Sequence, residues 1–187
     1  MIRKATRDDV AAIERVMLAS LRELGRRTYD AAQVASSLVY LAVPDEQLID
    51  DGTYFVAVVD DEVVACGGWS RRRKTHAGSA QSDADNTPLD PAREPARIRA
   101  MFTDPRFARR GLGRAILERC ERDAAAAGFA RIQLVAMRSG EELYRACGYV
   151  EVGDAPVTLE DGVVLECTLM EKAIRDSRFG IRDSGTS

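Results

Sequence analysis

The segment from Ala96 to Leu117 constrains the fold of this chain more than any other stretch of its sequence. Residues 96–103 read ARIRAMFT, a run that favours a β-strand, and Pro105 prevents that strand from continuing. A turn rich in arginine and glycine follows. After it, apolar residues recur at helical spacing, which predicts a helix from Gly113 to Ala127. The segment is therefore predicted to be a strand, a tight turn and a helix.

The turn has the chemistry of an anion-binding site. The first N–H groups of a helix have no partner inside the helix, and the helix dipole adds positive potential at the same end. Gly111 and Gly113 allow a phosphate to approach the backbone because they carry no Cβ. Positive charge comes from Arg109, Arg110 and Arg114. The turn alone supports a phosphate site and nothing more specific.

Two other phosphate-binding motifs fit this turn less well. A Walker loop needs Lys and then Ser or Thr after its last glycine, whereas Arg114 and Ala115 stand there. A dinucleotide fingerprint needs Gly or Ala where Ile116 stands. An NAD-dependent dehydrogenase is therefore a distant alternative.

The remaining pattern predicts a mixed α/β chain of one domain, residues 1–172, with a polar tail at 173–187. A first strand at 1–6 precedes helices at about 7–24 and 30–42, and strands 53–59 and 63–69 form a hairpin. Residues 71–95 are predicted to be a long polar loop. A strand at 132–136 is followed by a short helix, which a capping box at Ser139–Glu142 is expected to open. The last strands are expected near 157–159 and 163–170.

Composition excludes several classes of protein. The net charge of −3 argues against non-specific nucleic-acid binding. No apolar run is long enough for a membrane span, and no signal peptide is evident, so a cytoplasmic protein is expected. The four cysteines are not spaced as zinc ligands or as a redox pair, and the chain has a single histidine, His76. The basic cluster Arg71–Lys74 is either a solvated loop or a rim that attracts an acidic substrate or phosphates.

Two motifs make the sequence similar to the GNAT superfamily of N-acetyltransferases. The first is the turn, where Gly111 and Gly113 match the superfamily's phosphate-binding motif, although Ala108 departs from its usual Gln or Arg. The second is the run from Leu143 and Tyr144 to Gly148-Tyr149. The resemblance extends over residues 1–172. It implies a single domain whose central mixed, mostly antiparallel sheet is flanked by helices.

The resemblance also implies acetyl-CoA as co-substrate, without a metal, and an amine of a small molecule or peptide as acceptor. It assigns Tyr144 as the general acid at the CoA sulfur. The residues that it places at the acetyl-CoA are Met101, Phe102, Thr103, Arg109, Arg110, Gly111, Leu112, Gly113 and Arg114. Strand N–H groups near Met101–Thr103 would polarise the acetyl carbonyl. A homodimer is compatible with this reading, and a non-catalytic acetyl-CoA sensor is the alternative function.

Several roles stay open at this point. The proton acceptor is Glu94, Asp104, Glu142, His76 or a chain of waters, with Glu142 also expected to cap its helix. Met137 stands where related sequences often have Asn for a hydrogen bond to the pantetheine. Trp69 and Tyr29 either line an acceptor pocket or belong to the core.

Overall fold

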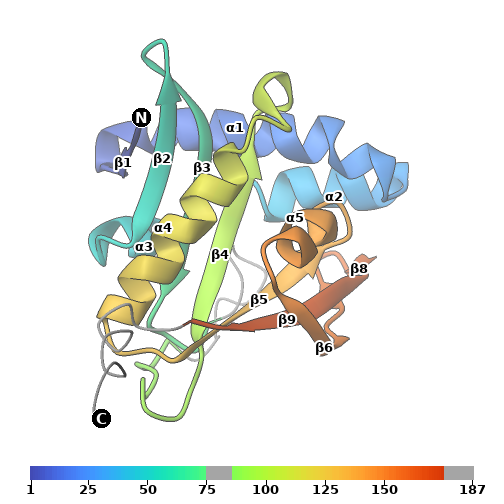
Figure 1. The fold of residues 1–187 in the computed structure, drawn as a ribbon. Helices are drawn as coiled ribbons and strands as arrows, with labels where there is room; N and C mark the ends of the chain where they lie inside the picture. The colour runs from blue at the N-terminus through green and yellow to red at the C-terminus, as the bar shows by residue number, and fades with distance from the viewer. Residues whose placement is uncertain (75–85, 175–187) are drawn as a thin grey trace, which may run out of the picture.

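A computed structural model describes residues 1–74 and 86–174 (Figure 1). A seven-stranded sheet runs through the molecule in the order β1-β2-β3-β4-β5-β9-β6. All neighbouring strands are antiparallel except β4 and β5, which are parallel. The predicted mixed, mostly antiparallel sheet is confirmed. The strands are β1 (Ile2–Lys4), β2 (Tyr54–Val59), β3 (Glu62–Ser70), β4 (Ala96–Thr103), β5 (Arg131–Met137), β6 (Val150–Asp154) and β9 (Cys167–Ala173). A separate pair is formed by β7 (Val157–Thr158) and β8 (Val164–Leu165).

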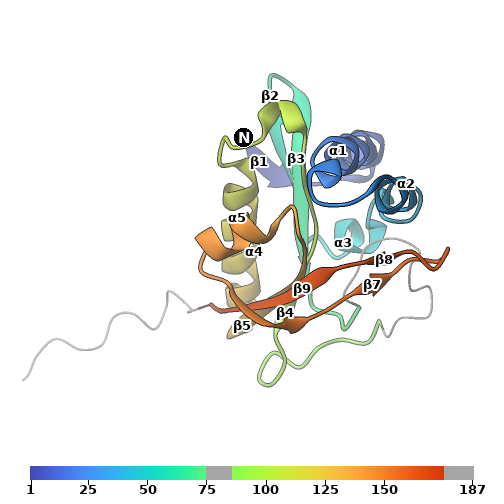
Figure 2. The same cartoon turned by 90° about the vertical axis from the view of Figure 1, so that its right-hand side faces the viewer.

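Helices cover both faces of the sheet (Figure 2). On one face lie α1 (Val10–Glu23), α2 (Ala31–Tyr40) and α3 (Glu46–Asp50); on the other lie α4 (Leu112–Ala126) and α5 (Glu141–Ala146). Strand alternation explains why both faces are apolar. In β2, Phe55 and Ala57 pack with the α4 side, whereas Tyr54 and Val56 pack with the α1 side. No helix in the described ranges is long and apolar enough to cross a membrane.

Short polar motifs fix where the elements begin and turn. The α2 helix opens with a capping box, in which Asp30 accepts from the N–H of Gln33 at 2.8 Å while the Gln33 side chain accepts from the N–H of Asp30. The β2–β3 hairpin turns at Asp60 and Asp61, whose φ values of 48° and 61° belong to the left-handed region that such tight turns use.

The sheet is divided between β4 and β5. Ladder pairs join these two strands only at Ala96–Ile132 and Arg97–Gln133. Beyond them β5 pairs along its whole length with β9, from Arg131 to Met137. Within the described part of the chain, the rest of β4 therefore has no strand neighbour on its β5 side. This parting of the sheet creates the space for the site described below.

The structure differs from the sequence-based expectation at two missed elements and at one predicted cap. Strand β6 was missed because it has only five residues, too few for a clear strand signal, and they are all exposed at the edge of the sheet. Helix α3 was missed because five residues are too few to show a helical period. The capping box at Ser139 is also wrong: α5 begins after Gly140 with no side-chain cap. Its acidic residues bind elsewhere, Glu141 to Thr168 and Glu142 to Arg109.

The described ends of the polar segment 71–95 are ordered. Arg72 and Pro88 form a β-bridge, the N–H of Leu89 donates to the carbonyl of Arg71 at 2.7 Å, and the Leu89 side chain is buried. His76, one candidate proton acceptor, lies outside the described residues.

Candidate active site

The turn before α4 adopts the backbone conformation that an anion site needs. Gly111 is the residue before the helix and has φ +79°, which favours glycine. A Cβ placed on Gly111 would meet nothing within 4 Å, so the space beside it is open. The N–H of Ala115 donates to the carbonyl of Gly111 at 3.0 Å. The N–H groups of residues 112–114 precede that bond and point out of the helix end.

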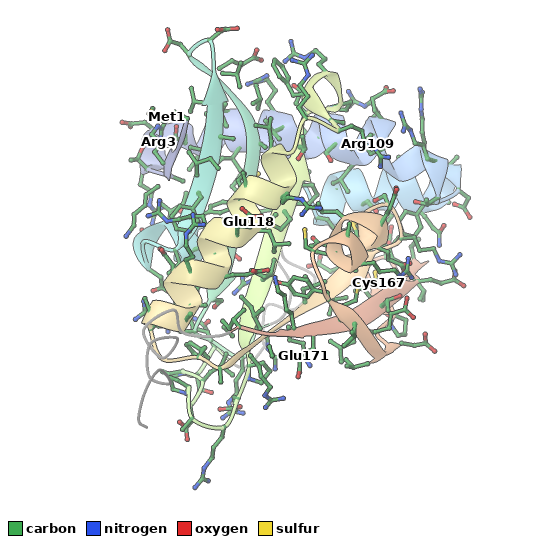
Figure 3. The ribbon with its side chains drawn as sticks, in the orientation of Figure 1. Met1, Arg3, Arg109, Glu118, Cys167 and Glu171 are labelled. Atoms are coloured by element: carbon green, nitrogen blue, oxygen red, sulfur yellow. The ribbon has the colours of Figure 1, made fainter. Side chains whose placement is uncertain are left out.

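The three arginines of the turn contact neighbouring elements, and Figure 3 shows Arg109 among them. Arg109 Nη1 lies 2.9 Å from Oε2 of Glu142 on α5, and this hydrogen bond raises the pKa of Arg109. Arg110 lies over the ring of Phe107, with 5.0 Å between Cζ and the centroid. Arg114 Nη2 donates to the carbonyl of Ala146, at the end of α5, at 3.3 Å. Two arginines thus connect the turn to the helix that carries Tyr144.

A cavity opens where β4 and β5 part. Its volume of about 130 Å³ is large enough for a small organic group rather than a single water. Met101 and Phe102, two of the residues expected at the acetyl-CoA, line it, whereas Thr103 lies beside Gly113 instead. The lining residues are Ser20, Leu21, Gly25, Leu41, Ile98, Arg99, Ala100, Met101, Phe102, Leu134, Val135, Met137, Ser139, Gly140, Tyr144, Val157, Leu165 and Cys167.

A β-bulge shapes the β4 side of this cavity. Between the pairs Cys66–Phe102 and Gly68–Arg99, the single residue Gly67 stands opposite two residues of β4. Ala100 is the strained one, with φ +52°. Its carbonyl accepts a hydrogen bond from the hydroxyl of Tyr54 at 3.4 Å. The two bulged residues are Ala100 and Met101, so the bulge includes the first residue of the predicted Met101–Thr103 segment.

Tyr144 reaches the cavity from α5. Its ring packs edge-on against Tyr149 with centroids 5.8 Å apart, and Gly140 leaves room for it, since a Cβ there would lie 3.1 Å from Cε2 of Tyr144. Burial raises the pKa of the Tyr144 hydroxyl well above its usual value. The phenol therefore keeps its proton at neutral pH.

The structure separates the carboxylate candidates for proton acceptor from the cavity. Glu94 pairs with Arg73, Glu142 pairs with Arg109, and no carboxylate of the described residues lines the cavity. Asp104 is buried beside Arg106, whose side-chain hydrogen bond is the main cause of a lowered pKa for Asp104. The expected capping role of Glu142 is wrong as well, since its carboxylate is bound by Arg109.

The open alternatives for the aromatic residues are now resolved. Trp69 is a core residue on the α4 side, packed edge-on against Phe129 with centroids 5.9 Å apart. Tyr29 is also buried, and its hydroxyl donates to the carbonyl of Glu166 at 2.8 Å. Neither lines the cavity, although the apolar cluster around Tyr29 does. Met137 lines it and offers no hydrogen-bond donor to a ligand there.

Cys167 lies in the cavity wall at the beginning of β9 (Figure 3). Burial is the main reason that its pKa is raised to about 11, so the thiol is protonated at neutral pH. Because the thiolate is the nucleophile, this environment argues against Cys167 as an attacking group.

The arginines of the basic cluster Arg71–Lys74 contact neighbouring residues. Arg72 pairs with Asp51 at 2.9 Å, Arg73 pairs with Glu94 at 2.6 Å, and Arg71 lies 5.5 Å over the Trp69 ring. The cluster is therefore better described as a solvated, ion-paired loop than as a rim that attracts an acidic substrate or phosphates. One charged residue of the site was missed by the sequence analysis. This is Arg99, whose charge interrupts the apolar run of β4 and whose side chain is 1% exposed.

Comparisons with known proteins identify the family and the fold of the chain. A family model described as the acetyltransferase (GNAT) family matches residues 18–149. No match was found among curated proteins. A GCN5-related N-acetyltransferase structure from Rhodopseudomonas palustris has a TM-score of 0.70 at 19% identity, covering 92% of this chain and 94% of that one.

Two further solved structures carry a ligand. PaiA N-acetyltransferase from Thermoplasma acidophilum, solved with coenzyme A, gives a TM-score of 0.61 at 14% identity over 92% of this chain and 98% of that one. YncA from Salmonella typhimurium, solved with acetyl-CoA, gives 0.62 at 19% identity over 94% of each chain. These identities establish likeness of fold, and the family match covers more than half of the chain. The chain belongs to the GNAT acetyltransferase family.

Proposed function

We propose that this protein is an N-acetyltransferase that moves the acetyl group of acetyl-CoA to an amine of a small molecule or peptide. The observation that carries the proposal is the cavity at the parted sheet, which is lined by Met101 and Phe102 of β4 and by Tyr144 of α5. Both substrates would bind together, and the amine would attack the thioester directly. Residues 1–172 would form the catalytic domain, with 173–187 as a tail.

The described residues fit acetyl-CoA. The pyrophosphate would bind the N–H groups of Leu112, Gly113 and Arg114, beside the open space at Gly111, with Arg109 and Arg110 adding positive charge. The pantetheine arm would run along the β5-facing side of β4, where ladder pairing ends after Arg97. The two ligand-bearing relatives were solved with CoA and acetyl-CoA, and we extend that ligand to this chain.

The chemistry divides into three tasks. N–H groups of the Met101–Thr103 strand would polarise the acetyl carbonyl. The amine must be unprotonated before it attacks, and a chain of waters would accept its proton, because no described carboxylate lines the cavity. Tyr144 would give its hydroxyl proton to the departing thiolate, a role that its buried, protonated phenol suits.

Thiol release from acetyl-CoA across a panel of amines tests this proposal. Amine-dependent release is the expected result. The competing function is a non-catalytic acetyl-CoA sensor, which predicts tight binding of CoA and no release with any amine. A titration of CoA by calorimetry, run beside the assay, separates the sensor from a protein that binds no CoA at all.

A further inference from the structure

The cavity extends through the sheet to the face opposite the phosphate turn. On the α4 side its walls include Ile98, Met101 and Tyr144, which belong to the apolar cluster packed beneath α4 and α5. On the other side its apolar walls come from α1, from the end of α2, from β4 and from β7–β9. These are Leu21, Leu41, Ala100, Phe102, Val157, Leu165 and Cys167. If acetyl-CoA enters from the α4 side, the acceptor occupies this second, apolar half.

Arg99 is the only side chain with a charge at neutral pH among the described residues that line the cavity. The bulge at Ala100 explains its position. Ile98 and Met101 pack toward α4, whereas Ala100 and Phe102 pack toward α1. Arg99 points to the α1 side as well, because it pairs with Asp45, the residue directly before α3. The bulge thus places two consecutive side chains, Arg99 and Ala100, on the acceptor side.

A buried arginine in an ion pair is not expected to add much to the stability of the fold. Removing two charges from water costs several kcal/mol per ion, and apolar replacements of buried ion pairs are often neutral or stabilising. Asp45 and Arg99 are 6% and 1% exposed. A guanidinium has five N–H donors in a fixed fork, so one arginine can bind two carboxylates. The pair with Asp45 fixes the fork, and its remaining donors would suit a second carboxylate.

We propose that Arg99 selects the acceptor, and that the acceptor is an amino acid with a free carboxylate and an apolar side chain. This inference rests on the proposed acetyl transfer at the same site. The carboxylate would bind the Arg99 guanidinium, and the apolar side chain would lie against Leu21, Leu41, Val157 and Leu165. The amine would then face Ala100 and Met101, on the strand that polarises the acetyl carbonyl.

The same arginine disfavours other amines. A polyamine would bring a second positive charge into a cavity that already contains one and offers no carboxylate among its described lining residues. Polyamines are therefore expected to be poor acceptors.

Four amines test the selection in the wild-type protein with acetyl-CoA. L-leucine has both the carboxylate and the apolar side chain, leucinamide and 3-methylbutylamine lack the charge, and spermidine is a polyamine. A charge-assisted hydrogen bond of this kind corresponds to about a 10- to 100-fold preference in kcat/KM for leucine. Equal rates for leucine and 3-methylbutylamine, or a preference for spermidine, would overturn the inference.

Variants then assign the preference to Arg99. Arg99→Lys keeps the charge but loses the fork, and the pair Arg99→Met with Asp45→Asn removes both charges without leaving Asp45 unpaired. Both should lower the ratio of kcat/KM for leucine to kcat/KM for 3-methylbutylamine about 10-fold or more. Arg72→Lys is the matched control, because Arg72 also pairs with an aspartate, Asp51, but does not line the cavity. Thermal unfolding and CoA binding verify that each variant is folded, and a retained leucine preference in folded variants contradicts the assignment.

Calorimetric titration of leucine and leucinamide into the wild-type protein saturated with CoA separates this inference from acetyl transfer itself. Leucine binding that Arg99→Lys weakens, without any thiol release, supports the selection and contradicts the enzyme. Thiol release with amines but no preference for leucine supports the enzyme and contradicts the selection. Neither binding nor release contradicts both.

Discussion

Gly113 and Leu143 are so close that a Cβ on residue 113 would lie 3.1 Å from Cδ2 of Leu143. This contact joins the first turn of α4, where the phosphate would bind, to α5, which carries Tyr144. The hydrogen bonds from Arg109 to Glu142 and from Arg114 to the carbonyl of Ala146 connect the same two segments. The donor site and the proposed general acid are therefore parts of one packed unit.

Gly113→Ala should lower kcat about 10-fold, because the new methyl displaces α5 and small misplacements of catalytic groups are costly. CoA affinity should change less, since the turn itself is retained. Adding Leu143→Ala removes the opposing methyl groups and should restore most of kcat in the double variant. A loss that Leu143→Ala does not relieve would show that the contact does not position Tyr144.

Tyr144→Phe should lower kcat about 100-fold while CoA affinity stays within about twofold, because general-acid catalysis contributes on this scale. Tyr149→Phe is the matched control: it also removes one buried phenol oxygen, yet Tyr149 does not line the cavity. Since burial raises the pKa of Tyr144, its ionisation should not reduce kcat near the ordinary tyrosine value of about 10. Equal kcat in the wild type and Tyr144→Phe would remove the assignment.

Gly111→Ala should weaken CoA binding at the phosphate turn. Alanine at φ +79° costs about 1–2 kcal/mol, so part of the effect is general strain. Gly162→Ala measures that part, because Gly162 has φ +84°, also has nothing within 4 Å of a built Cβ, and lies outside the cavity lining. Calorimetry should give a higher Kd for CoA in Gly111→Ala alone. Equal Kd values in the two variants would argue against the turn as the pyrophosphate site.

Asp9→Asn should lower the free energy of unfolding at neutral pH by about 1–2 kcal/mol. The hydrogen bond from Arg3, aided by the N–H of Thr6, lowers the pKa of Asp9 to about 2 in the folded protein, against about 3.9 when unfolded. The stabilisation is therefore complete above about pH 4 and is lost as the pH falls toward 2. Urea unfolding at neutral pH and near pH 3 should show a smaller difference at the lower pH. A difference that does not change with pH would contradict this origin.

The sequence predicted the part of the fold that has a strong local signal. The strand Ala96–Thr103 has the predicted bounds, and helix α4 begins one residue before the predicted Gly113. These elements alternate polar and apolar residues at a clear period, so local pattern and packing agree. Strand β6 and helix α3 have only five residues each, too few to show a clear period, and β6 is also wholly exposed.

The site was predictable only where its residues are adjacent in sequence. The phosphate turn and the Tyr144 helix each form a local motif. The position of Arg99 in the cavity depends on two features of the folded chain. One is the bulge at Ala100, and the other is the ion pair with Asp45 from the α2–α3 connection. Neither feature can be predicted from the sequence of β4 alone.

The initial rate of thiol release, measured while both acetyl-CoA and an accepted amine are varied, tests the central claim most directly. Direct attack in a ternary complex predicts double-reciprocal lines that intersect. Parallel lines would indicate a covalent acetyl-enzyme, for which Cys167 is the thiol in the cavity wall, and would contradict the account. Absence of release with every amine would contradict it as well.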